Sequence, residues 1–216
     1  MTHIFHPTTL REYDIRGIIG ETLGEADAYA IGRGFGTIVA RAGGGKVAVG
    51  YDGRISSPML EEALVRGLNE SGVDAVRIGL GPTPMLYYAE AVLDDVDGGI
   101  EITGSHNPAN YNGFKLVHRG RPFFGADIQK LGAMAMAGDW ASGAGSSEHH
   151  DILDQYLERL VQSIPEKAFR IGWDAGNGAA GPVIERLVKM IPGEHHLLFV
   201  DVDGQFPNHY PDPTDE

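Results

Sequence analysis

Hydrophobic and polar positions follow two alternating patterns along this chain. Short β-type runs occupy residues 46–51, 73–79 and 98–103, and amphipathic stretches with helical spacing occupy residues 57–72 and 83–93 between them. Strands separated by helices in this way usually join as parallel neighbours through right-handed crossovers. The pattern therefore predicts an α/β fold in which helices sandwich a mixed, mostly parallel sheet.

A further amphipathic helix is expected at residues 25–41, and it contains Gly32, Gly34 and Gly36. No strand precedes this helix, so the context of a phosphate-binding glycine loop is missing. We expect these glycines to allow close packing of the helix against the sheet.

The pattern changes beyond the third strand. Residues 111–124 are expected to form a hairpin or edge strand, and a helix follows at residues 127–137. Residues 138–147 are small, polar and aperiodic, as in a linker. Later helices are expected at residues 152–163 and 183–190, and later strands at 169–173 and 197–202. The chain thus divides into a first domain, residues 1–148, and an incomplete second domain of the same type, residues 149–216, which is thin for an independent core.

Composition narrows the function classes. The 216 residues carry a net charge of −13, which argues against nucleic-acid and anionic-membrane partners. No apolar run approaches the roughly 18 residues of a membrane helix, and residues 1–10 lack the apolar core of a signal peptide. The absence of cysteine excludes disulfides and a cysteine nucleophile, and is consistent with the cytoplasm. The 31 glycines suggest many tight loops.

A glycine-flanked serine follows the third expected strand, within Thr-Gly-Ser-His-Asn-Pro at residues 103–108. Arg54 follows the end of another strand. Because parallel strands end at one edge of the sheet, Ser105, His106 and Arg54 are expected to lie near one another. The serine lacks the G-x-S-x-G frame of an α/β-hydrolase, which argues against acyl transfer.

Positive charge is expected around this serine, from Arg16, Arg54, His106 and Lys115. A serine hydroxyl is a weak nucleophile unless a base, cation or metal activates it. Clustered cations suit a phosphoryl group, whose transfer depends on positioning and charge neutralisation. The alternative is a plain turn with solvated charges nearby, and the residues alone leave both interpretations open.

A rival motif lies in the second domain. Residues 176–181 form a literal G-x-G-x-x-G between a strand and a helix, and Asp201 stands about 20 residues further on, as in a dinucleotide-binding fingerprint. Asp174 argues against this reading, because its carboxylate would oppose a pyrophosphate. The other interpretation is a tight strand-to-helix turn.

Five segments occur in an order typical of one enzyme family. They read REYDIRG at residues 11–17, TGSHNP at 103–108, YNGFK at 111–115, DAGNGAAG at 174–181 and DGQFPNH at 203–209. Together they resemble the α-D-phosphohexomutase family, in particular its bacterial phosphomannomutase/phosphoglucomutase branch. The resemblance covers nearly the whole chain and implies the first domain of that family followed by part of the second.

The resemblance also implies a reaction. A phosphoserine donates its phosphoryl group to a mannose or glucose 1- or 6-phosphate, and the bisphosphate intermediate reorients and returns the other phosphate. Ser105 is then the phosphocarrier and, through its phosphate, a ligand of Mg²⁺. Lys115 is implied as a general acid/base, Arg16 as the group that stabilises transferring charge, and His106 as a further catalytic residue. The implied activator is a hexose 1,6-bisphosphate, and the implied substrate-binding residues are Arg54, Asn107 and Tyr13.

The chain lacks two features that the family members share, the later domains and a metal-binding loop. Members have four domains and hold Mg²⁺ with an Asp-Gly-Asp-Gly-Asp-Arg loop, and this sequence ends before such a loop. We therefore expect it to be the front part of a longer protein, to show no mutase turnover alone, and to self-associate through an exposed sheet edge. A dinucleotide-binding enzyme and a non-catalytic fragment are the alternative functions.

Overall fold

The computed structural model describes residues 2–164, 166–212 and 214. Within them, a 7-stranded sheet has the order β1-β5-β4-β2-β3-β7, with β6 beside β5. Its strands are Ile15–Ile18 (β1), Lys46–Tyr51 (β2), Asp74–Leu80 (β3), Gly98–Ile102 (β4), Tyr111–His118 (β5), Arg121–Phe123 (β6) and Ser147–His149 (β7). β4, β2, β3 and β7 are parallel, whereas β5 is antiparallel to β4 and β1. The predicted α/β fold with a mixed sheet is confirmed, although the strand pairs divide equally, three parallel and three antiparallel.

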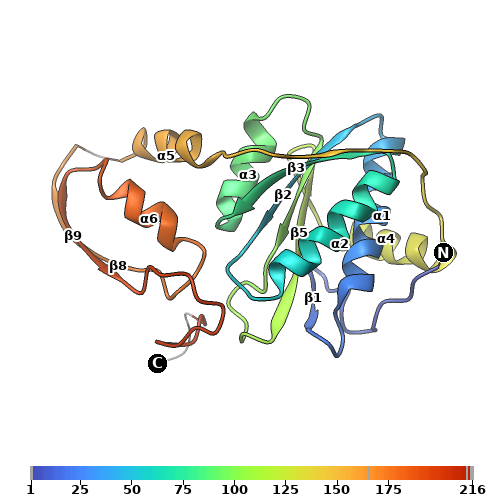
Figure 1. The fold of residues 1–216 in the computed structure, drawn as a ribbon, viewed down its shortest axis with the longest axis horizontal. Helices are drawn as coiled ribbons and strands as arrows, with labels where there is room; N and C mark the ends of the chain where they lie inside the picture. The colour runs from blue at the N-terminus through green and yellow to red at the C-terminus, as the bar shows by residue number, and fades with distance from the viewer. Residues whose placement is uncertain (1, 165, 213, 215–216) are drawn as a thin grey trace.

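Helices cover both faces of this sheet (Figure 1). They are Glu25–Arg41 (α1), Ser57–Glu70 (α2), Thr83–Val92 (α3), Ala126–Ala137 (α4), Leu153–Val161 (α5) and Gly181–Leu187 (α6). α1, α2 and α4 pack on one face, where Phe35, Leu64 and Phe114 are fully buried. α3 packs on the other face through Leu86. Helices on both faces explain why the central strands β2 and β4 are buried at successive residues and not only at alternate ones.

The second part of the chain adds a two-stranded parallel sheet, Phe169–Asp174 (β8) and Gly193–Leu198 (β9), at the left of Figure 1. Its helices α5 and α6 belong to the same apolar cluster as α3, and the rings of Tyr88 and Tyr156 lie 5.6 Å apart. The cores of the two parts are therefore continuous on the α3 face of the sheet.

Three expectations about the elements were wrong in detail. The last strand was expected at residues 197–202 but spans Gly193–Leu198, because Phe199 has a left-handed φ of 52° that ends it. β7 lies at the end of the expected linker, where exposed residues carry no apolar signal. β1 was not expected as a strand. Both β1 and β7 were missed in the sequence because they are short.

The helix glycines pack closely, but against helices rather than against the sheet. A Cβ on Gly32 would lie 2.1 Å from the backbone oxygen of Leu64 in α2, and one on Gly34 would lie 2.9 Å from Leu131 in α4. Glycine at these positions lets α1 approach both neighbours. The expected contact with the sheet is corrected accordingly.

Candidate functional site

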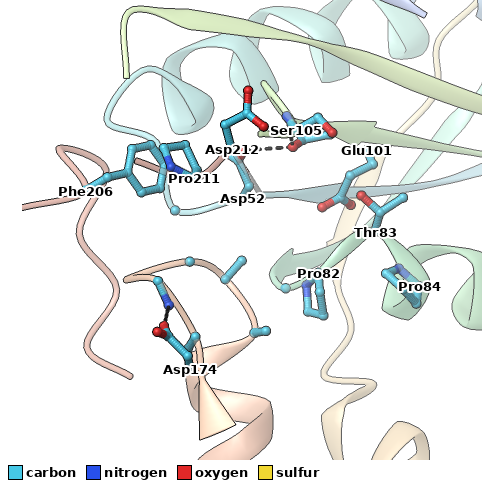
Figure 2. Close-up of a pocket in the computed structure, with 18 of the residues that line it drawn as sticks. Asp52, Pro82, Thr83, Pro84, Glu101, Ser105, Asp174, Phe206, Pro211 and Asp212 are labelled. Atoms are coloured by element: carbon cyan, nitrogen blue, oxygen red, sulfur yellow. Dashed lines mark hydrogen bonds between the residues drawn. The ribbon is translucent and has the colours of Figure 1, made fainter. Parts of the chain in front are cut away.

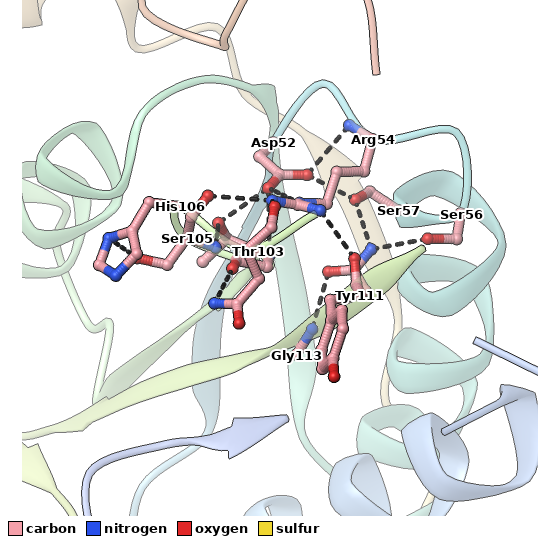
Figure 3. A network of polar contacts seen from close by, with 12 residues as sticks. Asp52, Arg54, Ser56, Ser57, Thr103, Ser105, His106, Tyr111 and Gly113 are labelled. Carbon is pink, nitrogen blue, oxygen red and sulfur yellow. Dashed lines mark hydrogen bonds and ion pairs between the residues drawn. The ribbon is translucent and has the colours of Figure 1, made fainter. Parts of the chain in front are cut away.

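The carboxylate of Asp52 joins the end of β2 to the loop that follows β4. It accepts hydrogen bonds from the Thr103 hydroxyl at 2.8 Å and from the Gly104 N–H at 3.2 Å, and also from Ser57 Oγ at 2.8 Å. Thr103 Oγ1 in turn accepts from the Ser105 N–H at 2.8 Å. Figure 3 shows this network beneath the loop of residues 103–111, called the serine loop below. The serine loop is thereby fixed to a neighbouring strand.

Arg54 lies beneath the serine loop with only 1% of its surface exposed. Its Nε donates to Asp52 at 3.1 Å. Its two Nη groups donate to four backbone oxygens of the loop at 2.6–3.0 Å, those of Ser105, Asn107, Pro108 and Tyr111. A guanidinium has five N–H groups, and all five are used. The expectation that Arg54 binds substrate is therefore corrected: in this structure it holds the serine loop and has no donor left for a ligand.

Ser105 sits at the tip of this loop, partly exposed and with a φ of 55°. A left-handed conformation is costly for a residue other than glycine, and such strain persists where surrounding contacts enforce it. Ser105 Oγ lies 3.5 Å from Nδ1 of the exposed His106. The Asn107 side chain donates to the Gly104 oxygen at 2.9 Å and closes the turn. The hydroxyl is thus presented outward on a loop held from below.

A second charged group lies beside the serine loop. Arg16 on β1 is opposite Gly113 on β5, and the Gly113 oxygen accepts from the Thr103 N–H at 2.9 Å. Asp14, which is buried, forms an ion pair with Arg16 and lies 3.8 Å from Lys115 Nζ. Nε of Arg16 is buried without a hydrogen-bond partner in the structure. Arg16 and Lys115 therefore converge on one carboxylate next to the strand ends.

Sequence reasoning missed both carboxylates that organise this region. Asp14 and Arg16 are two residues apart on an extended segment, so their side chains point to the same face. Asp52 directly follows a predicted strand, where polar residues reach the edge of the sheet. Each signal was present in the sequence.

A cavity of about 670 Å³ separates the serine loop from the second part of the chain (Figure 2). Of the predicted site residues, Ser105 alone lines it among the residues described; Asp52, Glu101 and Thr103 also line it from this side. Its opposite wall comprises residues 174–180 and 206–212 in part. Lys115 and Tyr13 line a separate cavity of about 230 Å³, where the exposed Tyr13 ring stacks on Phe124. The structure does not bring all the predicted residues into one cavity.

The pKa values of two acidic groups in the larger cavity are shifted in opposite directions. Burial raises the pKa of Glu101 well above its ordinary value, and the nearby charge of Asp52 adds to this effect. Asp174 contacts His209 at 3.1 Å, and this hydrogen bond lowers the pKa of Asp174. The pKa of His209 is raised by its hydrogen bond to the Tyr210 oxygen and by Asp174. Both ring nitrogens of His209 face oxygen acceptors, an arrangement that favours the doubly protonated, positively charged ring.

The glycine motif at residues 176–181 closes on its own chain. The Asn177 N–H donates to the Phe199 oxygen at 2.8 Å, and the Asn177 side chain donates to the Asp201 oxygen at 2.9 Å. A Cβ on Gly181 would lie 1.9 Å from the Val200 oxygen. These contacts bind Asn177 and Gly181 closely to residues 199–201 of the same chain. The motif is a tight strand-to-helix turn, and the dinucleotide alternative is not favoured.

The residues that the structure describes do not form a complete magnesium site. No group of three or more His, Asp or Glu side chains that could hold a metal occurs within the described ranges. The Asp52 carboxylate already accepts five hydrogen bonds, so it has little capacity left for a cation. A phosphate on Ser105 would supply one ligand group only.

None of the helices formed by the described residues combines the length and apolar character that crossing a bilayer requires.

Comparisons with known proteins agree with the fold. The family model described as phosphoglucomutase/phosphomannomutase, alpha/beta/alpha domain I, matches residues 7–141. A phosphomannomutase/phosphoglucomutase of Pseudomonas putida is 44% identical over 204 residues, which cover 94% of this chain and 44% of the relative. A phosphoglucomutase of Neisseria gonorrhoeae is 42% identical over 94% of this chain and 45% of its own length. This chain thus spans less than half the length of these relatives.

Solved structures give the same result. A phosphoglucomutase/phosphomannomutase family protein of Burkholderia thailandensis superimposes with a TM-score of 0.94 and 45% identity, over 98% of this chain and 48% of that chain. A structure described as a phosphomannomutase from Thermus thermophilus superimposes with a TM-score of 0.84 over 99% of this chain and 50% of that chain, at 23% identity, and so supports the fold alone.

Proposed function

This chain belongs to the phosphoglucomutase/phosphomannomutase family, and we propose on that basis that its protein moves a phosphoryl group between the 1- and 6-positions of a hexose phosphate, with Ser105 as the phosphocarrier. The single observation that supports this proposal best is the serine loop itself. Its four oxygens bind one buried guanidinium, and Ser105 is presented outward in a strained conformation. Such preorganisation suits a group that must accept and donate a phosphoryl group in one geometry.

We assign the charge-stabilising role to Arg16 and the acid/base role to Lys115. Arg16 retains an unpartnered buried N–H, the kind of donor that a phosphate oxygen satisfies. Lys115 lies near the same carboxylate and is partly exposed, so its ammonium can exchange a proton with a ligand. His106 and Asn107 shape the loop around the reacting serine, and Tyr13 offers an exposed ring beside Lys115.

We further propose that Mg²⁺ and a hexose 1,6-bisphosphate activator act in the full-length protein. We propose that the remaining metal ligands come from outside this chain, because the carboxylates among its described residues do not complete a site. The proposed substrates are mannose or glucose 1- and 6-phosphates, and the proposed compartment is the cytoplasm. The 216 residues alone are expected to show no turnover. The proposed domain division remains residues 1–148 and 149–216.

The test is phosphopeptide mapping of the longest native form of the protein after incubation with Mg²⁺ and a hexose 1,6-bisphosphate. Phosphate is expected on Ser105 and absent from Ser105→Ala. Thr103, whose hydroxyl is committed to Asp52, serves as an internal control that stays unmodified. An unmodified Ser105 in a folded, full-length protein would favour the non-catalytic alternative.

Self-association of this chain is a separate proposal. Among the described residues, β8 and β9 pair only with each other, so each leaves an unpaired backbone edge, and the side chains of Phe169 and Leu198 are about half exposed. Light scattering should give a mass that rises with concentration. A monomeric mass across a wide concentration range would contradict the proposal.

A further inference from the structure

A short segment of the second part of the chain, residues 202–206, lies directly on the loop that carries Arg54. A Cβ on Gly204 would lie 2.7 Å from the Gly53 oxygen and 2.9 Å from the Arg54 Cα. A Cβ on Gly53 would lie 2.2 Å from the Val202 side chain. The two glycines therefore allow a contact that any larger residue would force apart.

Phe206 ends this segment and reaches the buried arginine. The Arg54 Cζ lies over its ring, 5.1 Å from the centroid. Phe206 adopts a left-handed φ of 52°, which is unusual for an aromatic residue, and its N–H donates to the Asp203 oxygen at 3.0 Å in a tight turn. The backbone thus accepts a strained conformation where the ring meets the guanidinium.

The position of the Phe206 ring matters because Arg54 holds the serine loop in place. Its five N–H groups all lie in the guanidinium plane and are all used within the chain, four of them by the serine loop. A further partner can therefore reach this cation only from a face. An aromatic ring is attracted to a cation there, and it keeps water away from the hydrogen bonds behind it.

We propose that Phe206 is a positioning residue for the phosphorylated serine: by covering the Arg54 guanidinium, it makes the conformation of the serine loop depend on docking of the second part of the chain. Displacing the segment would leave the Arg54 hydrogen bonds open to water and the Ser105 loop less ordered. The catalytic consequence rests on the proposed function of Ser105, whereas the effect on loop order does not.

The experiment compares Phe206→Leu with the unchanged protein by amide hydrogen exchange. The variant keeps apolar bulk and removes the cation–π contact. The amides of Ser105, Asn107 and Tyr111 should exchange about tenfold faster, the size expected for losing one desolvated contact of this kind. Phe206→Tyr keeps the ring and should restore slow exchange.

Phe169→Leu is the matched control. Phe169 is also in the second part of the chain and also lies beside a cation, with Lys167 Nζ 5.2 Å from its ring, but it does not line the serine cavity. Its loss should leave serine-loop exchange unchanged. If Phe206→Leu does not fold, as judged by circular dichroism, Phe206→Met takes its place with the same expectation.

A second measurement links loop order to chemistry. In the longest native form, the rate of Ser105 phosphorylation by a hexose 1,6-bisphosphate should fall about tenfold in Phe206→Leu and recover in Phe206→Tyr. Unchanged loop exchange in a folded Phe206→Leu variant would overturn the inference. If the unchanged protein is never phosphorylated, the proposed function fails, while the exchange result still decides the positioning role.

Discussion

Replacing Arg54 with Met should destabilise the protein strongly. The variant keeps an unbranched side chain of similar length but removes all five donors. Four backbone oxygens of the serine loop then lose their partner, and the Asp52 carboxylate, with 15% of its side chain exposed, loses its counter-charge.

The magnitude follows from these contacts. A hydrogen bond to a charged group contributes about 1.5–3 kcal/mol, and the values for one side chain do not add. Removing one partner of a buried ion pair costs about 3–5 kcal/mol, because the other charge remains uncompensated. We therefore expect a loss of about 3–5 kcal/mol, which for a chain of this size lowers the Tm by roughly 6–20 °C.

Urea denaturation of Arg54→Met gives the free energy directly, and Arg41→Met is its control. Arg41 also binds a carboxylate through two hydrogen bonds, to Asp139 at 2.6 and 2.9 Å, but both side chains are about half exposed. Its loss should have a much smaller effect, because water screens and replaces an exposed pair. Equal losses in the two variants would refute the reasoning that the burial of Arg54 makes it the anchor of the loop.

Three further predictions follow from single contacts. Gly32→Ala should lower the free energy of unfolding by about 1–3 kcal/mol, because the new methyl group overpacks α1 against α2. Gly45→Ala, where a Cβ meets open space, should be nearly neutral, and equal unfolding midpoints for the two variants would contradict this prediction. Because burial raises the pKa of Glu101, the folded protein holds that proton more tightly than the unfolded one, and the stability that this group contributes falls as the pH rises above 4.5. Glu101→Gln should therefore gain stability relative to the unchanged protein between pH 5 and pH 8. A constant difference in urea midpoints over that range would count against this prediction. The His209–Asp174 pair should stabilise the fold most between pH 3.8 and 6.5, and this contribution should be lost above the raised pKa of His209 and below the lowered pKa of Asp174. Asp174→Asn should lower the pKa of His209 in an NMR titration, and an unchanged pKa would argue against the contact.

Much of the candidate site was predictable from local signals. Ser105 was identified from its glycine-flanked position after a strand, and Arg16 and Lys115 from their charge in an acidic chain. The role of Arg54 was not predictable. Nothing in the local sequence distinguishes an arginine that binds a ligand from one whose five donors are all used within the chain, because the four backbone oxygens that Arg54 contacts are more than 50 residues away.

The sequence by itself determined the layered α/β fold, since the alternation of apolar runs and amphipathic helices is a local property that each segment carries. It also determined which loop carries the serine. Only the tertiary structure decided that β1 and β7 complete the sheet, that the glycines of α1 face other helices, and that Phe206 meets Arg54. These features depend on contacts between segments far apart in the chain, whose free energy no local pattern records.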